Sequence, residues 1–280
     1  MNNTIAAALL LSLGLLFSSA AGDASGEMET TYVPGVHVCD GVEFDKTLSG
    51  DLSRQLESGN YYLTGDCIVR NHVMITGEVS ICLNGYKIDV HNARTLHVGR
   101  GGVLSIYDCS GEGLVGFTGG TDHNHPVTVD AGGTFNLHGG WLYAKNGSNA
   151  INSKGTVNIY GGLVESCDPG YCVVRNESEL NLYGGTLRGY LGVSQRGRAV
   201  MHICGESFVI DTVKNAVQYV SRDRPLYIDT PDYLWRTDPE GEFVSSAEQP
   251  YVYADRTAYL EFAFPASADN PAGEGAPSGE

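Results

Sequence analysis

The stretch "GTVNIYGG", residues 155–162, recurs along this chain at a nearly constant spacing. Close copies begin at residue 133 ("GTFNLHGG") and at residue 178 ("SELNLYGG"), so the offsets are 22 and 23 residues. Weaker copies extend the series in both directions: "SICLNG" at 80–85, "GVLSIYD" at 102–108 and "AVMHICG" at 199–205. A segment that repeats every 20 to 50 residues or so is typical of a solenoid protein.

The alternation within each copy indicates the kind of solenoid. Apolar Val157 and Ile159 flank polar Asn158, which is the period of two found in a strand with one buried face, and helical repeats are excluded. The two glycines allow a tight bend with positive φ. A unit of about 22 residues therefore predicts one turn of a parallel β-helix, with turns stacked about 4.8 Å apart. The residues expected to face the core are Phe135, Leu137, Val157, Ile159, Leu180 and Leu182.

The repeats differ in length. Steps of 23, 31, 22, 23 and 21 residues separate the first inward apolar residues of the copies, which we align as Ile81, Leu104, Phe135, Val157, Leu180 and Met201. The long step contains "SGEGLVGFTGGTDHNHP", residues 110–126, which predicts a loop outside the regular turn. Solenoid enzymes carry catalytic groups on such loops. Asp122, His123 and His125 form a His-x-His pattern with a nearby Asp, which could ligate a metal ion. The alternative is a solvated loop without function.

Both ends of the repeat array depart from the pattern. In "TLSGDLSRQLESGN", residues 47–60, Leu48, Leu52 and Leu56 stand four apart and Gly59 follows, which predicts a short amphipathic helix that caps the solenoid. After Gly205 the glycine rhythm stops. The segments 224–243 and 250–264 then predict longer, aromatic strands that close the stack as a C-terminal β cap.

The first residues indicate export. Residues 5–17 form a 13-residue apolar run that is followed by small residues, and this run is short for a membrane span. We expect a signal peptide at 1–21, although "MNNT" has no Lys or Arg; an uncleaved anchor or a misplaced start is the alternative. A lead-in at 22–43, a β-helix at 44–221, a cap at 222–264 and a disordered linker or tail at 265–280 complete the expected organisation. The expected location is secreted or cell-surface.

The composition restricts the partners. The chain of 280 residues has a formal net charge of −16 and only 18% charged residues. Nucleic acid is excluded as a partner because phosphate binding needs clustered Lys and Arg, and anionic membrane surfaces are disfavoured for the same reason. We expect a monomer that contacts an extracellular glycan or a host or cell-wall surface.

The repeats are similar to those of a known family. The run "LSGDLSRQLESGNYYLTGDCIVRNHVMITGEVSICLNGYKI", residues 48–88, followed by the "NLYGGT" turns, resembles the pectin-lyase-like repeat regions of large surface proteins from Gram-positive, often gut-dwelling, bacteria. The resemblance covers about residues 44–264 and includes the ending "YLWRTDPEGEF" and "YVYADRTAYLEF". It implies an all-β, right-handed parallel β-helix. It implies no single activity, because lyases, hydrolases, adhesins and passive spacers share this architecture.

Stacked turns also predict columns of outward side chains. The polar column contains Ser105, Asn136, Asn158 and Asn181, which can hydrogen-bond to one another without any further function. The aromatic column contains Tyr107, His138, Tyr160 and Tyr183, and Trp141 could extend it. Two interpretations stay open: cross-strand aromatic contacts that stabilise the sheet, or a platform of exposed rings that binds sugars.

Cysteine usage gives one candidate bridge. The seven cysteines, at 39, 67, 82, 109, 167, 172 and 204, allow at most three internal disulfides. Cys167 and Cys172 flank a Pro-Gly turn that could bring their sulfur atoms together, and buried free thiols are the alternative. No C-x-x-C pair exists, so no structural zinc site is expected.

An enzymatic function finds little support in the repeats. Polysaccharide lyases of this fold resemble one another in Ca²⁺-binding acids with an Arg or Lys base, and the hydrolases in inward-facing Asp residues. Here Glu165 and Arg188 align one turn apart, as expected for a surface ion pair. We therefore expect a non-enzymatic surface module without a cofactor, which binds glycans or acts as an adhesin or display scaffold. The alternatives are a lyase, with Ca²⁺, or a glycoside hydrolase acting on acidic polysaccharide, and a passive spacer.

Overall fold

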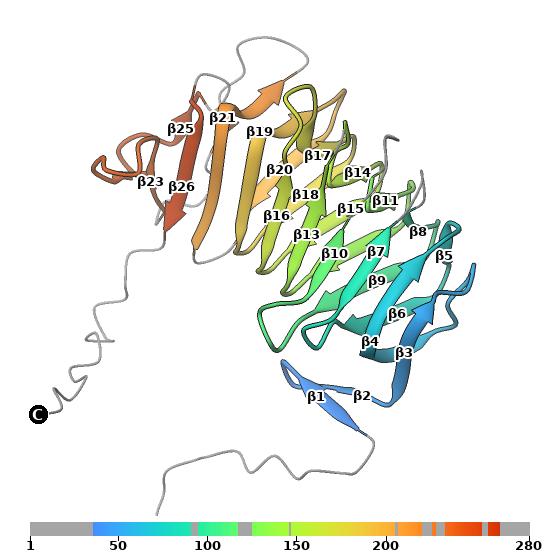
Figure 1. Cartoon of the computed structure of the whole chain (residues 1–280). Helices are drawn as coiled ribbons and strands as arrows, with labels where there is room; N and C mark the ends of the chain where they lie inside the picture. The colour runs from blue at the N-terminus through green and yellow to red at the C-terminus, as the bar shows by residue number, and fades with distance from the viewer. Residues whose placement is uncertain are drawn as a thin grey trace, which may run out of the picture. The chain divides into compact units, whose positions relative to one another are not determined.

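The computed structural model describes residues 36–90, 95–116, 125–145, 147–204, 207–219, 226–227, 233–253 and 257–263. All regular elements in these residues are β-strands (Figure 1). No helix in this part of the chain is long and apolar enough to cross a membrane. The expected signal peptide, the loop residues Asp122 and His123, and the C-terminal tail lie outside the described residues.

The strands form a parallel β-solenoid with three stacks, and each turn adds one strand to each stack (Figure 1). The first stack contains β3 (Lys46–Asp51), β4 (Gly59–Val69), β6 (Glu78–Cys82), β9 (Val103–Tyr107), β12 (Thr134–Leu137), β15 (Thr156–Ile159), β18 (Glu179–Leu182) and β20 (Val200–Ile203). The second stack continues from β3 and β4 into β7 (Lys87–Val90), β10 (Leu114–Gly116), β13 (Trp141–Ala144), β16 (Leu163–Ser166), β19 (Thr186–Gln195) and β21 (Ser207–Tyr219). The third contains β5 (Val73–Ile75), β8 (Leu96–Val98), β11 (Val127–Val129), β14 (Ile151–Ser153) and β17 (Cys172–Asn176), and ends in β19 and β21.

The sequence period correctly predicts the inward face. Val157 pairs with Phe135 in the turn before it and with Leu180 in the turn after it, and all three side chains are fully buried. The other predicted core residues, Leu137, Ile159 and Leu182, are at most 1% exposed. One hydrophobic core therefore runs through all the turns.

The alignment of the earliest repeat needs a correction. Leu104 pairs with Val79, whereas the sequence alignment placed Ile81 opposite it; Ile81 pairs with Ile106. A shift of two residues keeps the same face of a strand toward the core, so both valine and isoleucine are buried and the alternation alone cannot tell the two registers apart.

The Gly-Gly bends lie between the first and second stacks. The second glycine of each pair has positive φ: 84° at Gly140, 82° at Gly162 and 89° at Gly185. The first glycine is needed for a different reason, because a Cβ atom at Gly161 would lie 2.7 Å from the carbonyl oxygen of His138 in the turn before. Turns this closely stacked leave no room for a side chain at the bend.

The predicted N-terminal helix is absent from the described residues. Residues 46–51 form strand β3, and no helical turn follows in residues 52–58. The backbone instead pairs with the next turn: Leu48 lies opposite Leu63, and Leu52 donates its N–H to the carbonyl oxygen of Ile68 at 2.9 Å. Pairing with β4 outweighs a short helical pattern, because an isolated helix of this length is unstable. Leu52 and Leu56 still contribute to the core, as 6% and 5% exposed side chains.

Different structures adjoin the two ends of the stacks. At the N-terminal side, β1 (His37–Cys39) and β2 (Val42–Phe44) form a small antiparallel hairpin (Figure 1). At the C-terminal side, β26 (Tyr259–Ala263) pairs antiparallel with β21, and β23 (Leu234–Arg236) and β24 (Val244–Ser245) extend this layer. A separate pair joins β22 (Leu226–Tyr227) to β25 (Tyr251–Val252). Strands were expected in this C-terminal region.

Candidate functional site

The aromatic column exists and its rings stack on one another. The ring centroids of Tyr107 and His138 lie 4.2 Å apart, those of His138 and Tyr160 4.6 Å, and those of Tyr160 and Tyr183 4.5 Å. The interplanar angles are 7°, 11° and 16°, so the rings are nearly parallel. Each ring covers the face of the next one, and the column offers mainly ring edges and polar atoms to solvent.

Exposure changes along the column. Tyr107 is only 9% exposed, while Tyr160 is 41% exposed. Burial raises the pKa of the Tyr107 and Tyr183 hydroxyls. Burial lowers the pKa of the His138 imidazole, and the nearby Asp40 carboxylate partly opposes that shift. The column is therefore a packed feature at one end and an exposed feature further along.

The polar column forms a continuous chain of hydrogen bonds. Asn181 donates to Asn158 at 2.9 Å, Asn158 donates to Asn136 at 2.8 Å, and Asn136 donates to the Ser105 hydroxyl at 2.9 Å. These side chains occupy paired positions of β9, β12, β15 and β18. The amides thus link successive turns, as expected from the sequence.

Trp141 lies outside the aromatic column. It is the first residue of β13 in the second stack, it is 37% exposed, and its ring is tilted by 57° against Tyr143 at 5.0 Å. Tyr143 has a pKa raised to about 12, mainly by burial. Trp141 therefore presents an aromatic side chain to solvent on a neighbouring strand.

The structure describes the loop site only in part and shows the two cysteines of the predicted bridge as free thiols. Of the predicted loop ligands, only His125 lies in the described residues, where its Nδ1 atom is 3.2 Å from the carbonyl oxygen of Asn149. Cys167 and Cys172 are both free: Cys167 is exposed, whereas the buried Cys172 thiol donates to the Asn149 side chain at 3.1 Å. The predicted bridge is therefore not formed in this structure.

The predicted ion pair is present. Arg188 lies opposite Glu165 in the paired strands β19 and β16, and its guanidinium donates to the carboxylate at 3.0 Å. This hydrogen bond raises the pKa of Arg188. A carboxylate held by an arginine in this way is an ion pair rather than an acid/base catalyst.

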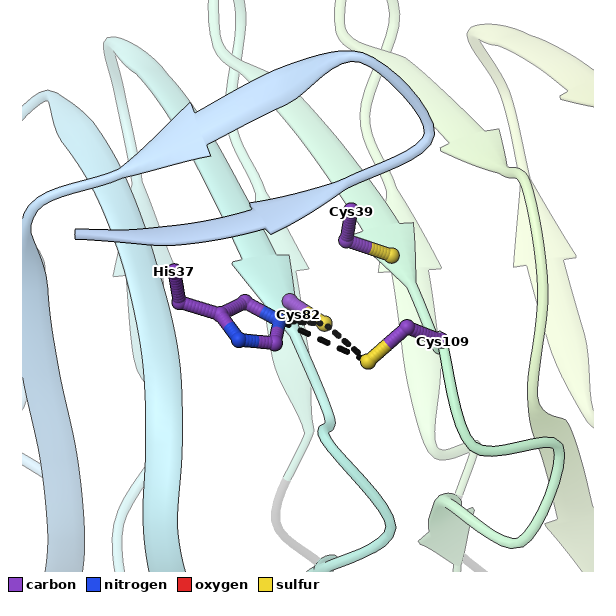
Figure 2. Close-up of side chains that lie close together, drawn as sticks. All are labelled: His37, Cys39, Cys82 and Cys109. Carbon is purple, nitrogen blue, oxygen red and sulfur yellow. Dashed lines mark hydrogen bonds between the residues drawn. The ribbon is translucent and has the colours of Figure 1, made fainter. Parts of the chain in front are cut away.

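A cluster that sequence reasoning missed lies under the hairpin: His37, Cys39, Cys82 and Cys109 (Figure 2). The possible ligand atoms of the four side chains all lie within 4.8 Å of one another. His37 Nε2 is 3.1 Å from Cys82 Sγ and 3.5 Å from Cys109 Sγ, and the two sulfur atoms are 3.9 Å apart. We call this group the His/Cys cluster.

The His/Cys cluster joins segments that are distant in the sequence. His37 and Cys39 belong to β1, Cys82 ends β6, and Cys109 follows β9 in the next turn (Figure 2). Strand register places Cys82 opposite Tyr107, so this cysteine occupies the aromatic column's position in its own turn. Burial raises the pKa of the Cys39 and Cys82 thiols and lowers the pKa of the His37 imidazole, so all three are neutral at pH 7 in the absence of a metal ion.

Comparison with known proteins adds no assignment: no family model, no curated protein and no solved structure matches this chain.

Proposed function

We propose that this chain is an exported, non-enzymatic surface module: a rigid display scaffold that also binds glycan through exposed aromatic side chains. The observation that carries the scaffold is the contact between outward side chains of successive turns. The asparagine chain and the stacked rings join four turns on the outside of the solenoid, in addition to the hydrophobic core that joins them inside. Outward side chains that hydrogen-bond to or stack on the neighbouring turns hold those turns together, which favours a stiff scaffold.

Glycan binding is supported by two exposed side chains among the aromatic residues that were predicted to bind sugars. Tyr160 is 41% exposed and Trp141 is 37% exposed, on adjacent stacks of the solenoid. Aromatic side chains with one polar end and an apolar body are well suited to contact sugar rings. Because the column rings cover each other's faces, we assign binding to Trp141 and to the exposed edge of Tyr160, with Tyr183 beyond it.

The proposal includes the assignment of this solenoid to the right-handed, pectin-lyase-like β-helices. The resemblance to pectin-lyase-like repeat regions of Gram-positive surface proteins supports export and a cell-surface location. A right-handed coil is the handedness that parallel strand connections almost always adopt. Neither a cofactor nor Ca²⁺ is part of the proposed function.

A glycan array with the full chain tests the proposal, together with reducing-end and unsaturated-product assays on uronate polymers. We expect binding without turnover, and a loss of binding of at least about tenfold in Trp141→Ala, which corresponds to about 1.4 kcal/mol. Tyr251→Ala is the matched control, because Tyr251 is 37% exposed, as Trp141 is, but belongs to β25 outside the three stacks, and it should leave binding unchanged. Ultraviolet-absorbing product would establish a lyase instead, and a folded chain that binds no glycan would reduce the function to a spacer.

A further inference from the structure

We propose that His37, Cys39, Cys82 and Cys109 bind one zinc ion, which fastens the β1–β2 hairpin to the side of the solenoid (Figure 2). This inference is independent of the proposed glycan binding. Two thiolates at about 2.3 Å from a tetrahedral zinc ion lie roughly 3.8 Å apart, and a thiolate and an imidazole nitrogen roughly 3.6 Å apart. The observed distance between the sulfur atoms of Cys82 and Cys109 is 3.9 Å. His37 Nε2 lies 3.1 Å from the Cys82 sulfur and 3.5 Å from the Cys109 sulfur.

The donor set selects the metal. Three thiols and one imidazole form a Cys₃His set, which is one of the combinations found in structural zinc sites. Ca²⁺ and Mg²⁺ require oxygen ligands, and none of the four side chains supplies one. Four protein ligands also fill the tetrahedral coordination shell, so no position stays open for a substrate or a catalytic water.

The surroundings of the His/Cys cluster hold the ligands in place. The His37 ring is stacked on Tyr62, with centroids 5.1 Å apart and an interplanar angle of 20°. Phe44 is fully buried and packs in one small hydrophobic cluster with Cys39, Cys82 and Tyr107. Asn84 accepts from the Cys109 thiol at 3.8 Å. The hairpin turn after Cys39 depends on positive φ at Asp40, 51°, and Gly41. Such outer contacts orient ligands before the ion binds.

The hairpin needs an attachment of this kind. Each of its strands has three residues, and they pair only with each other in the part of the chain that the structure describes. An isolated two-stranded hairpin is at best marginally stable in water. Its buried residues form a small cluster with Cys82 and Tyr107 that is separate from the main core. A zinc ion would link β1 to two successive turns, and coordination would release the three thiol protons to solvent.

A disulfide is the competing use of these cysteines. All three are free in this structure, and a bond between any two would leave the third thiol and the imidazole without a metal. Tetrahedral coordination uses all four groups: His37, Cys82 and Cys109 stand 3.1–3.9 Å from one another, and Cys39 lies within 4.8 Å of each. The proposal therefore commits to zinc, and a disulfide between Cys82 and Cys109 is an outcome that would contradict it.

The test is a metal titration of the full chain. The protein is reduced, freed of metal with a chelator and titrated with Zn²⁺ against a chromophoric competitor, and bound metal is counted by mass spectrometry. We expect one zinc per chain, and with Co²⁺ the ligand-field and thiolate charge-transfer bands of a tetrahedral site. Cys109→Ser should weaken zinc binding more than about 100-fold, since even outer contacts of a metal ligand are worth 10- to 100-fold.

The control variant is Cys204→Ser. Cys204 follows Tyr183 in the aromatic column's position at the far end of the repeats and is exposed, as Cys109 is, but it is not part of the His/Cys cluster. It should bind zinc like the wild type. Hydrogen exchange of residues 37–44 should slow on adding zinc to the wild-type chain, a readout that does not require any variant to fold. Three results would each overturn the proposal: no stoichiometric zinc binding by the wild type, an equal loss of zinc affinity in Cys204→Ser and Cys109→Ser, or a Cys82–Cys109 disulfide mapped in the purified chain.

Discussion

The two ends of the solenoid are held in different ways. At the C-terminal end, β26 continues the hydrogen-bonded sheet along residues 207–211 of β21, and its Leu260 and Phe262 are fully buried in the main core. At the N-terminal end, the β1–β2 hairpin pairs only with itself among the described residues, and Phe44 belongs to the small separate cluster. One end is thus joined through the backbone, and the other through side chains.

The difference shows what each attachment can do. An antiparallel strand on β21 occupies the edge that the last parallel strand would otherwise expose. The hairpin lies instead against the side of several turns: His37 stacks on Tyr62, Phe44 meets Tyr107 edge to face at 5.6 Å, and Asp40 lies 3.9 Å from His138. It covers one half of the aromatic column's positions and leaves Tyr160 and Tyr183 beyond it.

The largest effect is expected in the core that both ends share. Ile159→Asp would place an unpaired carboxylate at a fully buried position between two neighbouring turns. We expect a loss of more than about 4 kcal/mol of unfolding free energy, which prevents folding or lowers the melting temperature greatly. A calorimetric melt that matches the wild type would show that the assigned inward face is wrong.

Two phenylalanines compare the ends directly. Phe262→Ala should cost about 3–5 kcal/mol, because the side chain is fully buried in the main core. Phe44→Ala removes an equally buried ring from the separate cluster, so we expect it to free the hairpin while global unfolding changes much less. Denaturant titration measures the first effect, and hydrogen exchange of residues 37–44 the second. Equal changes in global stability would mean that the hairpin and the stack unfold as one unit.

A smaller effect is expected from the uncovered half of the aromatic column. Replacing Tyr160 and Tyr183 with Ser removes two stacked contacts, His138–Tyr160 and Tyr160–Tyr183, each worth about 0.2–1 kcal/mol. Tyr107→Ser should cost more, because that ring is 9% exposed and also contacts Phe44. Melting curves and glycan binding measured on the same variants separate a structural column from a binding surface: unchanged binding with lowered melting would exclude these tyrosines from the glycan site.

The smallest effect is a pH dependence of the folding stability, which arises from His138 at the boundary between the covered and uncovered halves of the aromatic column. Burial holds the pKa of His138 below its ordinary value near 6.5, so the unfolded chain takes up a proton that the folded chain does not. Stability should therefore fall as the pH decreases from about 6.5, and level off below the folded-state pKa. His138→Phe keeps a ring in the stack and should reduce this slope, whereas Asp40→Asn should steepen it. Identical slopes in all three proteins would show that His138 titrates normally.

The sequence was sufficient for the features that depend on local alternation. Val157 and Ile159 face the core because strand side chains alternate, and the spacing of the glycines places each bend. The same alternation could not choose between Val79 and Ile81 as the partner of Leu104, since both registers bury an apolar residue. Nor could it distinguish helix from strand in residues 47–60, where pairing with β4 decides the conformation.

The His/Cys cluster was beyond the reach of sequence patterns. Metal-binding motifs are recognised by ligands close together in the chain, but here 27 residues separate Cys82 from Cys109 and 72 separate His37 from Cys109. The repeat period brings Cys82 and Cys109 into adjacent turns. The hairpin that carries His37 and Cys39 lies outside the repeat, so only the folded chain reveals that its side chains meet theirs.

The asparagine chain gives the solenoid a direction. Asn136, Asn158 and Asn181 each donate toward the N-terminal neighbour, and Asn136 and Asn158 accept from the C-terminal one, so the three amide dipoles point the same way and polarise one another. Each interior member uses one donor and one acceptor, whatever its place in the row. Duplicating the segment from Asn136 to the residue before Asn158 would therefore add one more turn without creating an unsatisfied amide, whereas an insertion of half a turn would break the row. The solenoid can thus be lengthened only by whole turns, so its length is set by the number of turns.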